Sequence, residues 1–307
     1  MDRAPRDAVA ALDCGTNSTR LLITGPGLPE LRLMRITRLG QGVDATKKLD
    51  PDAIARTLDV LAEYRAEMDH HHVSRARLVA TSAVRDAENG DEFLDAASRV
   101  VGFPAELLDG GAEGALAFAG ATASLEIPDA DVAIIDIGGG STELVTGAGG
   151  IRAISLDLGC VRLTERYLHH DPPTRDELQA ASPFVRSELD RAAGALPRLT
   201  QPDLTLVGLA GTVSTLGALT HGLTHYDRDK IHHSVLGAAD VSEWCDRLAA
   251  ETAAERGRRP GMAAGREDVI VGGALVLREA MARFGFDRCL VSEADILDGI
   301  AASLARP

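Results

Sequence analysis

The chain has 307 residues, of which 45% are hydrophobic and 25% carry a charge. This is the composition of a globular protein with two domains of about 150 residues. A net charge of −14 argues against nucleic acid or an anionic membrane as a partner, because no long-range positive field would attract either. The first apolar run is too short for a signal peptide or spanning helix, and the four scattered cysteines are typical of reduced thiols. We therefore expect a cytoplasmic protein.

The first predicted element, at residues 9–21, has a near copy at residues 132–144. The two segments read VAALDCGTNSTRL and VAIIDIGGGSTEL, and seven of the thirteen positions are identical. Each is an apolar run, an Asp, a turn with Gly, Ser and Thr, and a second apolar run. This is the pattern of a β-hairpin with a functional turn. Two copies predict a duplicated fold.

The composition of these turns favours an anionic ligand. Glycine lets backbone amides approach an anion, Ser and Thr add hydroxyl donors, and the strand-end Asp can hold a divalent metal. Two such turns facing each other would clamp a phosphate chain. A single Asp-x-Gly turn is also common in hairpins without a ligand, so the argument depends on the matched pair.

Strands and helices alternate after each hairpin, which is typical of α/β domains. In the first half we expect a strand over 31–39, a helix over 51–70, a strand over 77–81 and a helix over 92–101. In the second half we expect strands over 152–156, 204–208 and 289–291. Helices are predicted over 161–169, 175–196, 240–256, 267–284 and 296–304. The helix that starts near 211–214 can present free amides to an anion. The predicted domains are residues 1–128 and 129–307.

Five motifs in order resemble the Ppx/GppA family of exopolyphosphatases and guanosine pentaphosphate phosphohydrolases, within the actin, hexokinase and Hsp70 superfamily. They occupy residues 13–18, 80–89, 136–143, 158–166 and 208–212, and DIGGGSTE at 136–143 is the most specific. The length is similar to that of the short, two-domain members common among actinobacteria.

The resemblance implies two actin-like (ribonuclease H-like) α/β domains with a cleft between them, and a last helix, about 296–305, that packs back on domain I. It implies hydrolysis of the terminal phosphate of polyphosphate, or of pppGpp to ppGpp, with Mg²⁺ or alternatively Mn²⁺. Relatives are often dimers, so a homodimer is a further expectation.

By motif position, the resemblance also assigns roles to single residues. Glu113 corresponds to the general base, with Arg85 and Glu143 as further catalytic residues. The metal would be held by Asp136, Glu143 and Asp13. The phosphate-binding residues would be Asn17, Ser18, Gly138, Gly139, Gly140, Ser141, Gly211 and Thr212. The family pattern Ser-Gly-x-Glu-Glu-Ala is here Asp109-Gly110-Gly111-Ala112-Glu113-Gly114, so the first glutamate and the final alanine are replaced.

The residues alone leave other interpretations open. Glu113 can be a solvated first-turn helix residue, and Arg85 can form a surface ion pair with Asp86. Arg162 and Arg166 lie on a charged helix face, where solvation is the commoner outcome. A kinase or ATPase of the same superfamily would also grip phosphates between two turns, although no P-loop motif is present. A pppGpp or ppGpp sensor without turnover is the remaining alternative.

Overall fold

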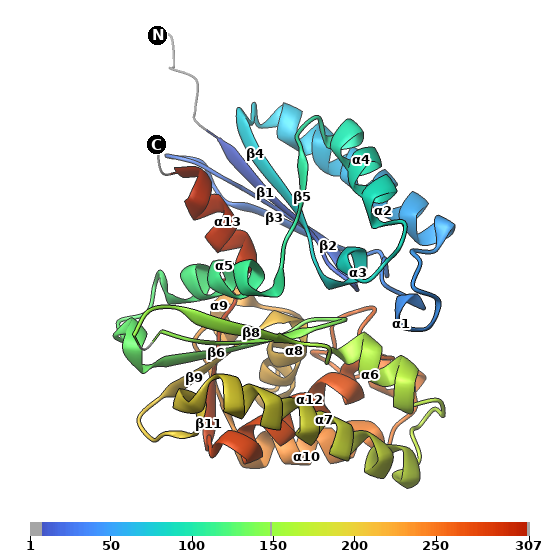
Figure 1. Cartoon of the computed structure of the whole chain (residues 1–307), viewed down its shortest axis with the longest axis vertical. Coiled ribbons are helices and arrows are strands. Elements are labelled where there is room, and N and C mark those ends of the chain that lie inside the picture. The colour runs from blue at the N-terminus through green and yellow to red at the C-terminus, as the bar shows by residue number, and fades with distance from the viewer. Residues whose placement is uncertain (1–7, 148, 306–307) are drawn as a thin grey trace. The chain divides into compact units, whose positions relative to one another are not determined.

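The computed structural model describes residues 8–147 and 149–305, and Figure 1 shows the course of the chain. The chain divides into two compact units. Unit 1 consists of the chain up to Gly120 together with the segment from Ile296 onward, and unit 2 is Ala121–Asp295.

Unit 1 is built on a five-stranded sheet. Its strands are β1 (Val9–Cys14), β2 (Ser18–Thr24), β3 (Leu31–Ile36), β4 (Arg75–Ala80) and β5 (Ala105–Leu107), in the order β3-β2-β1-β4-β5. The first three strands pair antiparallel, whereas β1, β4 and β5 are parallel. The central strand β1 is buried along its whole length, as its continuous apolar run predicts.

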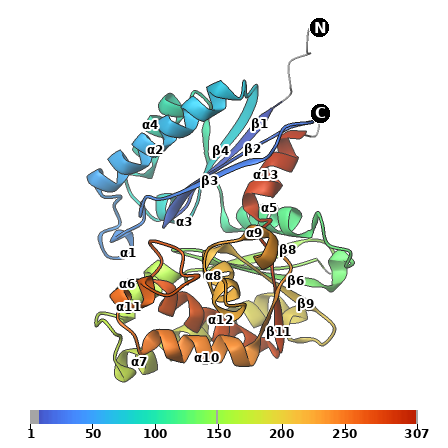
Figure 2. The same ribbon diagram turned by 180° about the vertical axis from the view of Figure 1, so that it is seen from behind.

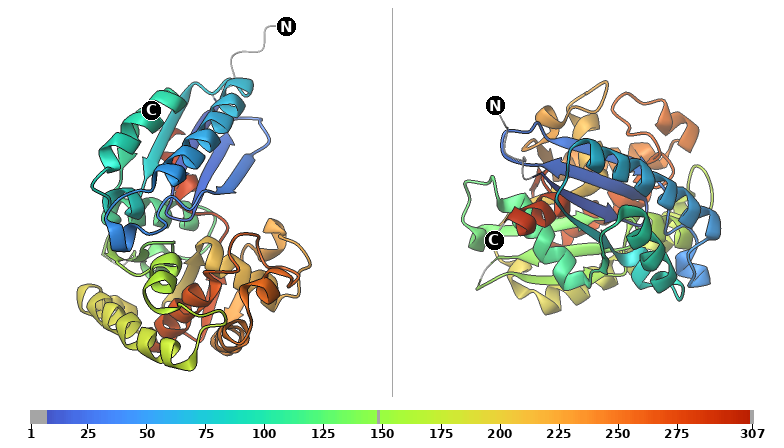
Figure 3. Two further views of the ribbon diagram at one scale, coloured as in Figure 1. Left: turned by 90° about the vertical axis from the view of Figure 1, so that its right-hand side faces the viewer. Right: turned by 90° about the horizontal axis from the view of Figure 1, so that it is seen from above.

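Helices cover both faces of this sheet. The pair α2 (Pro51–His70) and α4 (Gly90–Val101) lies on one face (Figure 2). Figure 3 shows α13 (Ile296–Ala305) on the other, where it contacts β1, β2 and β4. Helix α2 begins where the sequence indicates, because the Asp50 carboxylate accepts hydrogen bonds from the backbone N–H groups of Asp52 and Ala53. The remaining helices of this part are α1 (Val43–Thr46), α3 (Ser82–Arg85) and α5 (Gly110–Thr122), of which the last two residues belong to unit 2.

Unit 2 repeats the arrangement around a six-stranded sheet. Its strands are β6 (Val132–Ile137), β7 (Thr142–Thr146), β8 (Arg152–Leu156), β9 (Thr205–Leu209), β10 (Val235–Gly237) and β11 (Arg288–Val291). The order is β10-β11-β9-β6-β7-β8, with β6, β9 and β11 parallel and β10 added antiparallel at the edge. Strands β6, β7, β8, β9 and β11 therefore occupy the places of β1 to β5. This duplicated order, with three antiparallel strands followed by parallel ones, is the ribonuclease H-like fold that the family resemblance implied, and it confirms the duplication that the paired hairpins predicted.

The helices of unit 2 pack around α12 (Ile270–Phe284), which contacts four of its neighbours. These neighbours are α6 (Cys160–Tyr167), α7 (Arg175–Ala195), α8 (Ala210–Thr220) and α10 (Ala238–Ala249). The remaining short elements are η1 (Asp129–Asp131), η2 (Pro197–Thr200), α9 (Arg228–Ile231) and α11 (Ala253–Gly257). Among the helices of the described residues, none combines the length and apolar character needed to span a membrane.

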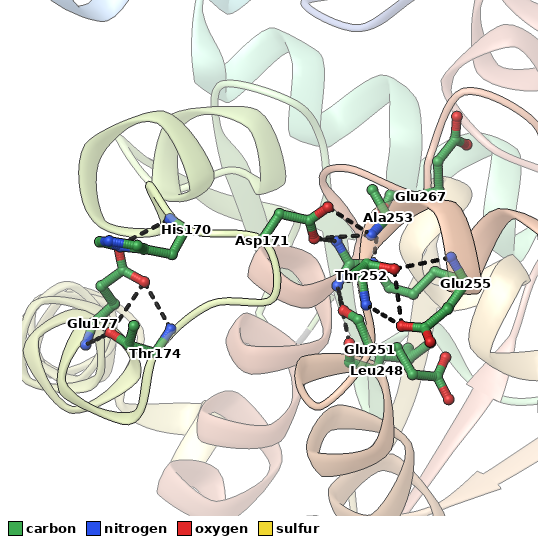
Figure 4. A network of polar contacts seen from close by, with 11 residues as sticks. His170, Asp171, Thr174, Glu177, Leu248, Glu251, Thr252, Ala253, Glu255 and Glu267 are labelled. Carbon is green, nitrogen blue, oxygen red and sulfur yellow. Dashed lines mark hydrogen bonds and ion pairs between the residues drawn. The ribbon is translucent and has the colours of Figure 1, made fainter.

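Three predicted boundaries are wrong. The expected strand over 31–39 ends at Ile36, the helix expected from 267 begins at Ile270, and the helix expected over 240–256 is two helices, α10 and α11. The break occurs because Thr252 caps α11 by accepting a hydrogen bond from the Glu255 N–H. Figure 4 shows this cap beside Asp171, whose carboxylate accepts the Ala253 N–H. Buried Arg256 donates to Asp171 and to the carbonyl of Leu248, which fixes the turn between the two helices.

Candidate active site

The first hairpin turn lies between β1 and β2 in unit 1. The Gly15 N–H donates to the Ser18 carbonyl at 3.0 Å, which closes the turn. The Thr16 hydroxyl lies 2.9 Å from that of Ser82, at the start of α3, and so joins the turn to the end of β4. Asn17 is buried, and its Nδ2 makes no hydrogen bond within the described part of the chain. A buried amide donor in this position suits an anionic ligand.

Asp13, at the end of β1, is engaged by an arginine of the next strand. It pairs with Arg20 in the β1–β2 register, and Arg20 Nη2 and Nε donate to its Oδ2 at 2.6 and 3.0 Å. A carboxylate that is already compensated by a guanidinium is a weaker ligand for a cation than a pair of carboxylates would be.

The second turn, between β6 and β7 in unit 2, has the same closure. The Gly138 N–H donates to the Ser141 carbonyl at 3.0 Å. A Cβ on Gly138 would lie 3.1 Å from that carbonyl, as a Cβ on Gly15 would lie 3.1 Å from the Ser18 carbonyl. The predicted phosphate-binding residues Gly138, Gly139, Gly140 and Ser141 are thus one compact turn, and the two copies match in geometry as well as in sequence.

The two copies differ at the strand position opposite the Asp. Where β1 has Asp13 opposite Arg20, β6 has Asp136 opposite Glu143. Both carboxylates are buried, with Glu143 only 1% exposed and Asp136 9% exposed. The Ser155 hydroxyl of β8 donates to Glu143 Oε1 at 2.7 Å. Two buried carboxyl groups placed opposite each other on paired strands supply the oxygen ligands that a divalent cation prefers.

Arg85 and Glu113 are brought together in unit 1. Arg85 ends α3, Glu113 lies in the first turn of α5, and Arg85 Nη1 is 3.4 Å from Glu113 Oε2. Arg85 Nη1 also donates to the Leu108 carbonyl at 2.9 Å. Glu113 is 8% exposed, so its interpretation as a solvated helix residue is wrong. With a guanidinium next to a carboxylate, the site can bind two groups at once. Arg85 can donate to a phosphoryl oxygen, and Glu113 can accept a hydrogen bond from a water.

Gly211 and Thr212 form the start of α8. Strand β9 is parallel to β6, and Leu209 pairs with Asp136 in the register. The chain therefore enters α8 at the carboxyl ends of these strands, which is also where the second turn lies. Ala210, at the bend, has a φ of 66°, a strained conformation for a residue with a side chain. The Thr212 side chain is 2% exposed, and a Cβ on Gly273 of α12 would lie 2.2 Å from its hydroxyl.

Sequence reasoning missed Arg266, which covers Gly211. A Cβ on Gly211 would lie 1.7 Å from the Arg266 guanidinium carbon, so the guanidinium rests directly on this glycine and would have to move if a side chain were added. Burial raises the pKa of the Cys160 thiol, and the nearby positive charge of Arg266 opposes that rise. Arg266 lies outside every recognised motif, so only the folded chain reveals a cation at this helix start.

The predicted site residues thus form two groups. Unit 1 carries Asp13, Asn17, Ser18, Arg85 and Glu113, and unit 2 carries Asp136, Gly138, Gly139, Gly140, Ser141, Glu143, Gly211 and Thr212. A duplicated ribonuclease H-like unit with one glycine turn per copy is the arrangement of the actin-like class of proteins.

Comparison with known proteins narrows this class. The model of the Ppx/GppA phosphatase family matches residues 30–306. The chain is 47% identical to a Mycobacterium tuberculosis protein called Exopolyphosphatase 2, covering 97% of this chain and 98% of that protein. This chain belongs to the Ppx/GppA phosphatase family.

Solved structures agree with the assignment. A Ppx/GppA family member from Aquifex aeolicus is similar with a TM-score of 0.80 and 35% identity, covering 98% of both chains. An exopolyphosphatase from Cytophaga hutchinsonii is similar with a TM-score of 0.87 and 26% identity, covering 97% of both chains.

Proposed function

We propose that this protein is an exopolyphosphatase, which removes the terminal phosphate of inorganic polyphosphate by hydrolysis of a phosphoanhydride bond. The observation that carries the proposal is the 47% identity, over nearly the whole chain, to the mycobacterial protein called Exopolyphosphatase 2. The two matched glycine turns support it, because each can offer backbone N–H groups to phosphate oxygens. Hydrolysis of pppGpp to ppGpp is a second activity that the same chemistry would allow.

In this proposal each glycine turn offers backbone N–H groups to phosphate oxygens, and Arg85 and Glu113 act on the terminal phosphate. Arg85 offers a planar, charged donor to the equatorial oxygens, which a lysine would not reproduce. Glu113 accepts a proton from the attacking water and orients it in line with the scissile bond. In the structure Arg85 and Glu113 contact each other, so substrate would compete for the guanidinium and release the carboxylate for the water.

The changed residues before Glu113 leave the loop well anchored. Asp109 Oδ1 accepts the Ala112 N–H at 2.8 Å, and the Asp109 carbonyl accepts the Glu113 N–H at 2.9 Å. These bonds fix the first turn of α5 although Ala112 replaces a glutamate. The anchored loop favours the enzyme over the sensor.

The residues of unit 2 suit a divalent cation. Asp136 and Glu143 supply two opposed carboxylates, and Mg²⁺ usually binds through one or two carboxylates together with waters and substrate phosphates. No cluster of three or more His, Cys, Asp or Glu side chains that could hold a metal occurs in residues 8–147 and 149–305. We propose Asp136 and Glu143 as the ligands, with Asp13 a lesser candidate because it is paired with Arg20. When bound, Mg²⁺ or Mn²⁺ would neutralise charge on the phosphate oxygens.

The test is release of phosphate, in Mg²⁺, from short polyphosphate, long polyphosphate, pppGpp and ATP in parallel. Glu113→Gln keeps the shape of the side chain and should lower kcat by roughly 10²- to 10⁴-fold. Glu106→Gln is the control, because Glu106 is an exposed carboxylate of the same unit that pairs with Arg77. We expect polyphosphate to be the best substrate.

Each alternative gives a different result. Binding of pppGpp without phosphate release would identify a sensor, and release from ATP alone would identify an ATPase. A homodimer is proposed from the family resemblance, and a size measurement in solution tests it. A cytoplasmic location is proposed from the short first apolar run and the scattered cysteines.

A further inference from the structure

The carbonyl groups of the second glycine turn are held from behind by the start of α6. The Cys160 N–H donates to the Gly138 carbonyl at 3.0 Å, and the Val161 and Arg162 N–H groups donate to the Gly139 carbonyl at 2.9 and 3.1 Å. The Arg162 side chain completes the set, because its Nε donates to the Gly140 carbonyl at 2.7 Å. Three successive carbonyls are therefore bound by one helix start.

These bonds fix the direction of the opposite side of each peptide. In a trans peptide the N–H points away from the C=O of the same unit, and the described chain has its cis peptide at Asp171–Pro172, outside this turn. With their carbonyls directed at α6, the three peptides direct the N–H groups of Gly139, Gly140 and Ser141 away from it. Amides fixed in this way are preorganised for an anion and need no reorganisation when it binds.

Arg162 contributes its side chain as well as its backbone N–H to these carbonyl contacts, and it is buried. Its exposed fraction is 7%, which corrects the expectation that it is solvated. Arg166, one turn further along α6, is exposed and lies over the Phe184 ring. A buried guanidinium hydrogen-bonded to a carbonyl is costly to disturb, because the freed carbonyl loses a charged donor.

The first turn in unit 1 shows the same construction independently. The Asn17 carbonyl accepts the Thr37 and Arg38 N–H groups at 3.1 and 3.0 Å, and the Thr16 carbonyl accepts the Gly40 N–H at 2.9 Å. In both units the segment that follows the third strand holds the turn carbonyls. The recurrence in a duplicated fold indicates that this support belongs to the function of the turns.

We infer that Arg162 is a positioning residue, which orients the backbone amides of Gly139, Gly140 and Ser141 towards a phosphate group without touching it. The kinetic part of this inference depends on the proposed phosphatase function, whereas the orientation of the turn does not.

The experiment compares Arg162→Met, Arg162→Lys and the control Arg166→Met. Amide hydrogen exchange of Gly138, whose N–H closes the turn by donating to the Ser141 carbonyl, is measured without ligand, together with kcat and KM for polyphosphate and the melting temperature. Arg162→Met should speed exchange in this turn by about tenfold or more. It should raise KM more than it lowers kcat, because the turn holds phosphate in both the ground and transition states. Arg162→Lys should recover part of both effects, and Arg166→Met should change neither.

The inference is overturned if turn exchange and KM are unchanged in Arg162→Met, or if Arg166→Met has the same effect. Exchange that rises equally in β6 and β9 also overturns it, since that would be general destabilisation. If Arg162→Met fails to fold, Arg162→Lys decides, with faster turn exchange at an unchanged melting temperature expected. If the wild-type protein releases no phosphate, the proposed function fails while the exchange result still decides the role of Arg162.

Discussion

Replacement of Gly159 by alanine should damage the second glycine turn specifically. Gly159 has φ −144° and ψ 165°, which alanine adopts without strain. The added Cβ, however, would lie 2.3 Å from the Gly139 carbonyl oxygen and 2.6 Å from the Gly140 nitrogen. Both are backbone atoms and no side chain can swing aside, so turn and helix must separate by about 1 Å to reach ordinary contact near 3.4 Å.

Overpacking of this kind costs about 1–3 kcal/mol of stability, a fall in melting temperature of roughly 2–10 °C. A displacement of about 1 Å in a binding turn can cost about 100-fold in catalytic efficiency. We therefore expect Gly159→Ala to lose far more kcat/KM for polyphosphate than its modest loss of stability explains.

The assay measures kcat/KM and thermal unfolding side by side. Gly194→Ala is the matched control, because Gly194 is an exposed residue of α7 whose added Cβ would meet nothing within 4 Å. That variant should keep full activity and gain up to about 1 kcal/mol. Wild-type activity and stability in Gly159→Ala would refute the packing argument.

Two further predictions concern charge. Burial would raise the pKa of Glu177, but hydrogen bonds from His170 and the backbone hold it at about 2, so its stabilisation is present above pH 4.5 and is lost as the pH falls towards 2. Glu177→Gln should therefore lower the melting temperature at pH 7, with the difference from wild type narrowing below pH 4.5; a constant difference would contradict this. Asp136→Asn should raise the Mg²⁺ concentration for half-maximal phosphate release by about tenfold or more, while the exposed control Asp157→Asn should not, and equal Mg²⁺ dependence of the two would exclude Asp136 as a ligand.

Local patterns predicted much of the fold because they are encoded in neighbouring residues. The two hairpins, the helix after Asp50-Pro51 and the helix after Thr174 depend on hydrophobic periodicity and on caps within a few residues. The break within residues 240–256 is also encoded locally, because Thr252 and Glu255 form a capping box, which marks the start of a new helix. The apolar periodicity continues through this break and therefore predicted a single helix.

The sequence by itself determined the duplicated hairpins, the glycine turns and the family motifs, all of which are short and contiguous. Tertiary structure alone decided which distant residues meet. It placed Arg85 against Glu113, 28 positions apart, and Arg162 beneath Gly140, 22 positions apart. It also placed Arg266 over Gly211. Such contacts depend on strand order and helix packing, which bring together segments whose own sequences carry no record of their partners.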